Sequence, residues 1–75
     1  MTARKVAIRT IGNGQSEAMV LVLKNFADGW TYEVQGLESG PLALPWRTET
    51  MRAAEEKLKA SYDDTIWDIR ILEDS

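Results

Sequence analysis

Cysteine and histidine are both absent from this sequence of 75 residues. Disulfide bonds are therefore excluded, and so are the zinc, copper and iron–sulfur sites that take their ligands from these two residue types. Catalytic arrangements of the Ser-His-Asp or Cys-His kind are excluded too, because each of them contains a histidine. We therefore interpret the chain as non-enzymatic, with no catalytic, cofactor-binding or metal-binding residues and no cofactor.

Long apolar runs are absent as well. The first five residues lead directly into a strand pattern, so we expect neither a signal peptide nor a membrane-spanning segment. The lack of cysteine fits a reducing compartment, and we expect a cytoplasmic location. Acidic side chains outnumber basic ones by twelve to nine. This balance disfavours nucleic acid as a partner, because affinity for phosphate backbones comes from lysine and arginine.

The length predicts one domain, residues 1–75. A chain this short buries only about 60% of the surface that its unfolded form exposes, so its stability is marginal. Small domains compensate with disulfides, a metal ion or a partner chain. Because the common forms of the first two are excluded here, we expect association with a second copy or with another protein.

Four segments have the pattern of β-strands. Asp28-Gly29 is among the strongest hairpin signals, and alternation of period two follows it. The apolar run before this dipeptide also suits a helix, but turn signals at both of its ends favour a strand. The strands are predicted at residues 5–11, 18–26, 30–34 and 65–72, with a turn at 12–16 and a loop at 36–46.

A helix is predicted at residues 49–62, with Thr48 as its N-cap. Glu55 and Lys59 form an i,i+4 pair that we expect on its solvent side. Its apolar stripe at helical spacing consists of Met51, Ala54, Leu58 and Tyr62. The predicted fold is therefore α+β, a two-layer β-β-β-α-β arrangement in which an antiparallel meander carries one helix on one face. The place of the last strand, beside the first or the third, stays open.

The hairpin predicts which side chains share a face of the sheet. A two-residue loop at Asp28-Gly29 places Lys24 opposite Glu33, which is a favourable cross-strand pair. One face then carries the natural seat for the helix, formed by Met19, Leu21, Leu23, Trp30, Tyr32 and Val34. The other face carries Val20, Val22, Lys24, Phe26, Thr31, Glu33 and Gln35.

The second face is the candidate functional surface, because one helix covers only one face of a sheet. Its apolar centre is Val20, Val22 and Phe26, and its rim is Lys24, Thr31 and Glu33. We expect a protein-interaction module that self-associates as a homodimer or larger homo-oligomer, or docks on another protein, through this surface. The alternative is that charged neighbours and the loop at residues 41–46 cover these apolar side chains.

A role with nucleic acids is the alternative function. Direct binding would use Arg4, Lys5 and Arg9. Inhibition by mimicry of a phosphate backbone would use the acidic set Glu55, Glu56, Asp63, Asp64, Asp68, Glu73 and Asp74. A small-molecule pocket between the helix and residues 41–46 is a third possibility.

The turn Asp28-Gly29-Trp30 and the later helix at residues 52–56 bear on the nucleic-acid alternative. Over residues 18–60 this arrangement resembles the plant-type and integrase-arm sheet DNA-binding domains in architecture. The resemblance implies contact with DNA through the exposed sheet. The basic side chains that such domains carry there are replaced by Thr31, Glu33 and Gln35. No residue role is therefore carried over.

Overall fold

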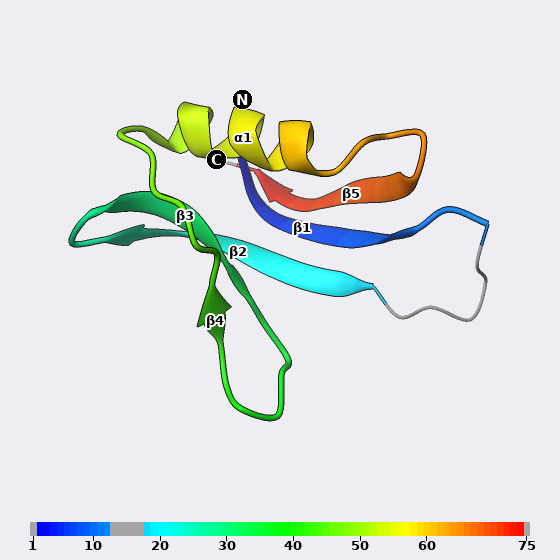
Figure 1. Cartoon of the computed structure of the whole chain (residues 1–75), viewed down its shortest axis with the longest axis horizontal. Helices are drawn as coiled ribbons and strands as arrows, with labels where there is room; N and C mark the ends of the chain where they lie inside the picture. The colour runs from blue at the N-terminus through cyan, green and yellow to red at the C-terminus, as the bar shows by residue number, and fades with distance from the viewer. Residues whose placement is uncertain (1, 13–17, 75) are drawn as a thin grey trace.

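The computed structural model of this chain describes residues 2–12 and 18–74. Within these ranges the chain forms five strands and one helix: β1 (Ala3–Thr10), β2 (Met19–Phe26), β3 (Gly29–Val34), β4 (Leu42–Ala43), α1 (Met51–Ser61) and β5 (Trp67–Asp74). The strands form one antiparallel sheet in the order β4-β3-β2-β1-β5, and α1 lies across one face (Figure 1). The structure confirms the predicted α+β fold with one helix on a meander.

The C-terminal strand lies at an edge of the sheet. β5 pairs with β1, with Val6 opposite Ile71 and Ile8 opposite Ile69. The opposite edge is the two-residue strand β4, which pairs with β3. No helix in the described part of the chain has the length and apolar character needed to cross a membrane.

The core lies between α1 and the face of the sheet that the sequence assigned to it. Ala54 and Leu58 of the helical stripe are buried, and Met51 and Tyr62 pack against them half-buried. The sheet contributes Ala3, Val6, Ile8, Leu21, Leu23, Tyr32 and Val34 to this core. The three tryptophans, Trp30, Trp46 and Trp67, pack against it half-buried.

The hairpin between β2 and β3 turns one residue earlier than expected. Its two-residue loop is Ala27-Asp28, so Phe26 lies opposite Gly29. Glycine is required at position 29 for a different reason: its φ is +136°, and a Cβ there would lie 2.6 Å from the carbonyl oxygen of Thr48. Because the turn comes one residue earlier, each residue of β2 lies opposite a residue of β3 two positions from the expected one. A shift of two leaves every side chain on its predicted face of the sheet.

The helix begins two residues later than expected. Thr50 is the N-cap, and its hydroxyl accepts a hydrogen bond from the Ala53 N–H at 3.1 Å. The predicted cap, Thr48, is wrong because its backbone pairs with Trp30, donating to the Trp30 carbonyl at 2.9 Å and accepting from the Trp30 N–H at 2.8 Å. The helix ends at Ser61, before Asp63 and Asp64, whose negative charges would be unfavourable near the negative end of the helix dipole.

The segment expected as a loop lies along β3 as a strap, which we define as residues 41–48. Its strand β4 places Leu42 opposite Val34, and the Leu44 N–H donates to the Tyr32 carbonyl at 3.0 Å. The bridge between Thr48 and Trp30 closes the strap at its other end. β3 is therefore an interior strand. Most of the predicted turn at residues 12–16 lies outside the described residues.

Candidate functional site

The face of the sheet turned away from α1, here called the open face, is the predicted interaction surface. No helix or strand of the described residues lies over it (Figure 1). The pairing registers place Ala7 beside Val20, and Lys5 beside Val22. Ala7, Val20 and Val22 thus form a contiguous apolar strip across β1 and β2, and all three are half-buried.

Phe26, predicted as part of the apolar centre, is covered by Arg47 of the strap. The Arg47 guanidinium lies 4.9 Å from the centre of the Phe26 ring, a cation–π contact. Arg47 is held there by the Asp28 carboxylate at 2.8 Å and by the carbonyls of Leu44 and Trp46 at 2.7 and 2.9 Å. This contact could not be predicted from periodicity in the sequence, because Arg47 lies in a segment without regular secondary structure.

Two ion pairs lie on the open face, one on either side of the apolar strip. Lys24 Nζ lies 2.9 Å from Glu33 Oε1, and Arg9 Nε lies 3.7 Å from Asp68 Oδ2. The Lys24–Glu33 pair forms diagonally, because Lys24 lies directly opposite Thr31. Hydrogen bonds from Lys24 and then Gln35 hold the pKa of Glu33 below its usual value, so this carboxylate stays ionised at neutral pH.

Thr31 does not lie at an exposed rim. It is fully buried, and its hydroxyl has no hydrogen-bond partner among the described residues. It belongs to an interior strand and lies directly opposite Lys24. Of the six predicted site residues, the structure leaves Val20, Val22, Lys24 and Glu33 accessible in part, while Phe26 lies under Arg47.

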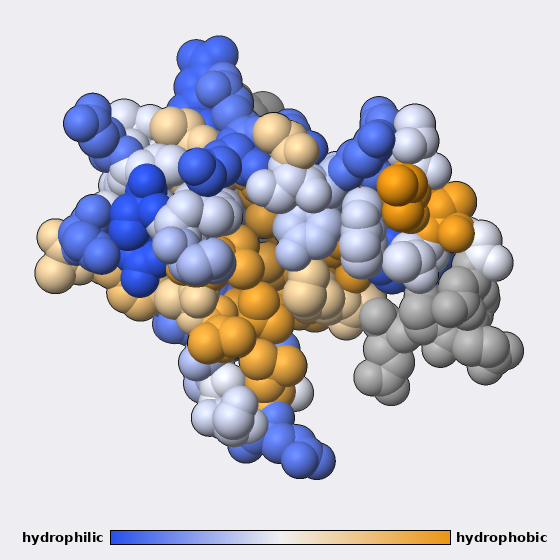
Figure 2. Space-filling model, in the orientation of Figure 1, coloured by the Kyte–Doolittle hydropathy of each residue, from blue (hydrophilic) through white to orange (hydrophobic). Residues whose placement is uncertain are grey.

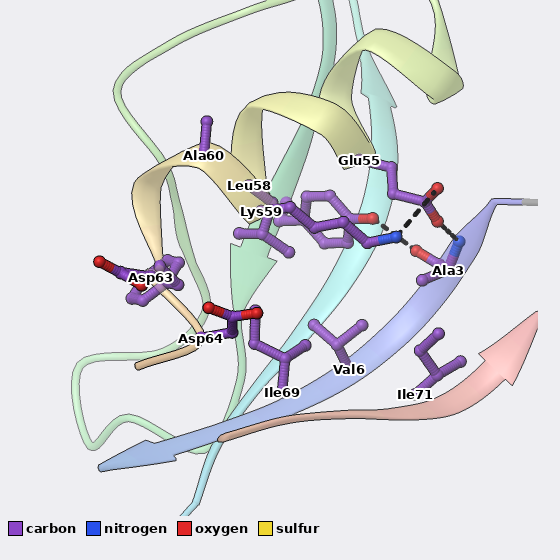
Figure 3. A pocket seen from close by; sticks show the side chains of 12 residues that line it. Ala3, Val6, Glu55, Leu58, Lys59, Ala60, Asp63, Asp64, Ile69 and Ile71 are labelled. Atoms are coloured by element: carbon purple, nitrogen blue, oxygen red, sulfur yellow. Dashed lines mark hydrogen bonds and ion pairs between the residues drawn. The ribbon is translucent and has the colours of Figure 1, made fainter. Parts of the chain in front are cut away.

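A groove runs between α1 and the strands β1 and β5, on the helical face (Figure 3). Its volume is about 530 Å³, and Val6, Ile69 and Ile71 form its apolar floor. Asp63 and Asp64, just after the helix, also line it. This hollow is not the pocket expected beside residues 41–46, which lie along β3.

The polar groups at one end of the groove satisfy one another. The Ala3 N–H donates to the Glu55 carboxylate, and the Tyr32 hydroxyl donates to the Ala3 carbonyl at 2.5 Å (Figure 3). Lys59 Nζ lies 3.8 Å from Glu55 Oε1. The predicted solvent-exposed position of Glu55 is wrong: its exposed fraction is 7%, because its partner lies on the first strand. Within this cluster no polar group is left unpaired for a ligand.

The buried phenol of Tyr32 gives a pH-dependent prediction. Burial, and secondly the charge of Glu55, raises the pKa of Tyr32 to about 12. The folded state therefore keeps this proton when the unfolded state has lost it, so its stabilising contribution is present below the ordinary pKa of 10.0 and is lost as pH rises towards 12. An ultraviolet absorbance titration should show one phenol ionising near pH 12, and Tyr32→Phe should remove it. An unchanged titration in that variant would contradict the assignment.

The acidic set does not share one surface. Glu55 is a buried residue of α1, whereas Asp68 lies on the open face beside Arg9. Among the described residues no group of three or more carboxylates is close enough to hold a metal ion. This arrangement gives no support to mimicry of a phosphate backbone.

Exposed apolar side chains gather in two places. Figure 2 shows one patch over β4 and another at the end of the molecule where β5 begins. Leu42 on β4 is 59% exposed, and Ile66 just before β5 is 57% exposed.

Comparison of the chain with protein-family models, with curated proteins and with solved structures gave no match.

Proposed function

We propose that this chain is a small non-enzymatic protein-interaction module that self-associates through the open face of its sheet. The observation that carries the proposal is the apolar strip of Ala7, Val20 and Val22 on a face without a covering helix or strand. Contact with a second copy would remove this strip from water. The proposed setting is the cytoplasm, where a chain without cysteine loses nothing to reducing conditions.

The charges that flank the strip suit such a contact. Lys24 with Glu33, and Arg9 with Asp68, are already paired within the chain. A partner surface can therefore approach the strip without isolating these four charges, which would be costly. Lys5 and Arg70 also lie on this face, and they would have to stay at the solvent-exposed margin of the contact. A chain this short without disulfides is expected to be only marginally stable alone, and association with a second copy would stabilise it.

Val22→Asp tests this proposal. The substitution puts two carboxylates into the centre of a symmetric contact, so the mass measured by light scattering should fall from that of the assembly to that of one chain. Because Val22 lies half-buried on the face away from α1, we expect the circular dichroism spectrum to keep its native shape. Val22→Thr is the matched control, since it keeps the β-branched shape. An unchanged assembly in Val22→Asp would contradict the proposal.

Weak nucleic-acid binding by the same face is the second candidate. The observation in its favour is that four basic side chains of adjacent strands share the open face: Lys5, Arg9, Lys24 and Arg70. This function predicts retention of DNA or RNA at low salt, with an affinity that falls steeply as salt is added. Lys5→Gln should weaken such binding, whereas the self-association proposal assigns Lys5 no role.

A further inference from the structure

Among the described residues no strand pairs with the outer edge of β5, the longer of the two edge strands of the sheet. β5 has eight residues, while the opposite edge strand β4 has two. Exposed edges offer free N–H and C=O groups to another chain, and proteins commonly protect them with proline, lysine, bulges or covering segments. β5 contains no proline and no lysine. Its pairing with β1 shifts register beyond Ile71 but is regular from Trp67 to Ile71, which is the stretch left open for pairing.

The backbone groups that point outward from β5 can be identified. The Ile11 N–H donates to the Ile66 carbonyl at 2.8 Å, which continues the ladder between β1 and β5. Hydrogen-bonded positions alternate along an antiparallel ladder. The main-chain groups of Asp68 and Arg70 therefore point towards β1, and those of Ile69 and Ile71 point away from the sheet. An added strand would bond to the latter two.

The side chains of β5 are self-complementary in one register. We propose that β5 pairs antiparallel with β5 of a second copy, about a two-fold axis at Ile69. This places Asp68 of each copy opposite Arg70 of the other and Trp67 opposite Ile71. An axis at Arg70 would place the Arg70 side chains of the two copies opposite each other. An axis at Asp68 would do the same with the two Asp68 side chains. Like charges directly opposite are destabilising, so the register at Ile69 is preferred.

The charges needed for this contact are available. Arg70 is exposed and forms no ion pair with the described residues, and Asp68 is 3.7 Å from Arg9, which leaves its second oxygen free to accept. Both side chains lie on the open face, because they pair with Ala7 and Arg9. The dimer would gain two symmetry-related cross-strand pairs between Asp68 and Arg70.

The apolar side chains of β5 also gain cover. Ile71 is 48% exposed and Ile69 half-buried, and both line the groove beside α1 (Figure 3). In the proposed register Ile71 packs against Trp67 of the second copy on this helical face. The two sheets become one continuous sheet, with both helices on the same side, because the two-fold axis is perpendicular to it. The regular run is short, so the interface is small and the dimer should dissociate on dilution.

This contact goes beyond the open-face proposal, because it uses the edge of the sheet and leaves the strip of Ala7, Val20 and Val22 uncovered. Amide hydrogen exchange followed by NMR separates the two. When the wild-type chain is concentrated enough to associate, the amides of Ile69 and Ile71 should become protected. Dilution should remove that protection.

Charge substitutions test the register. Arg70→Asp should weaken dimerisation by about tenfold or more, because both cross-strand pairs become repulsive. Asp68→Arg should do the same, and an equimolar mixture of the two variants should associate again, since it restores opposite charges at both positions. Arg52→Asp, the same charge change on an exposed side chain of α1, is the matched control and should leave dimerisation unchanged.

Three outcomes would overturn the edge contact: unprotected Ile69 and Ile71 amides in the associated protein, equal dimerisation of Arg70→Asp and Arg52→Asp, or a mixture that stays dissociated. The open-face proposal fails separately. If Val22→Asp dissociates the protein while Arg70→Asp does not, the open face is the interface and the edge contact is wrong. The reverse pattern supports the edge contact and removes the open face.

Discussion

Replacing Leu58 by alanine is expected to lower the free energy of unfolding by about 3 kcal/mol. Leu58 is 1% exposed and belongs to α1, so the cavity left behind would lie between this helix and the sheet. A domain of this length has a total stability of only about 4–11 kcal/mol, so the loss is a large fraction of it. Urea denaturation measures the change, as a lower midpoint with an unchanged slope.

Leu42→Ala is the matched control for this prediction. It removes the same atoms from a side chain that is 59% exposed on β4, and it should change stability by no more than about 0.5 kcal/mol. Equal losses of unfolding free energy in the two variants would mean that Leu58 is not buried between α1 and the sheet.

Replacing Gly29 by alanine is the second large effect, a loss of about 3 kcal/mol. The backbone there has a φ of +136°, which an L side chain rarely adopts. The added Cβ would lie 2.6 Å from the Thr48 carbonyl oxygen, and this oxygen accepts the Trp30 N–H. The strap must move away from β3 to make room. Because Arg47 precedes Thr48, we expect Phe26 to lose its cover, detectable as stronger binding of an apolar dye.

Gly36→Ala separates backbone strain from the clash. Gly36 also has a positive φ, of +78°, but an added Cβ would meet no atom within 4 Å. This variant should cost about 1 kcal/mol, the price of the backbone conformation alone. A Gly29→Ala variant as stable as Gly36→Ala would contradict the close approach of the strap.

The strands, the helix and their faces could be predicted, because each depends on periodicity within a short segment. The predicted hairpin register was wrong by one loop position, yet the assignment of faces survived, because partners moved by two residues. Asp28-Gly29 suits a turn by local preference. The actual constraint on Gly29 comes from Thr48, which lies far along the chain.

The remaining errors share this origin. Thr48 has the composition of an N-cap, but its backbone is used by Trp30, so Thr50 takes that role. The helical pattern predicts that Glu55 is exposed to solvent. In the structure it is buried, and its carboxylate accepts a hydrogen bond from the Ala3 N–H. The short strand β4 has too few residues for a periodic signal. Each case depends on a contact between distant segments.

The candidate site was predicted in part for the same reason. Val20 and Val22 lie on the open face as expected, since the alternation of β2 places them there. The cover of Phe26 by Arg47 depends on a segment without regular pattern. The edge position of β5, which the sequence left open, depends on which strand it pairs with.

The solution mass of the protein tests directly whether the chain self-associates through its sheet. Light scattering after size exclusion should be recorded over a wide range of protein concentration and salt. Self-association predicts an average mass above that of one chain, rising with concentration. A folded protein with the mass of one chain at every concentration would contradict both the open-face proposal and the β5 contact.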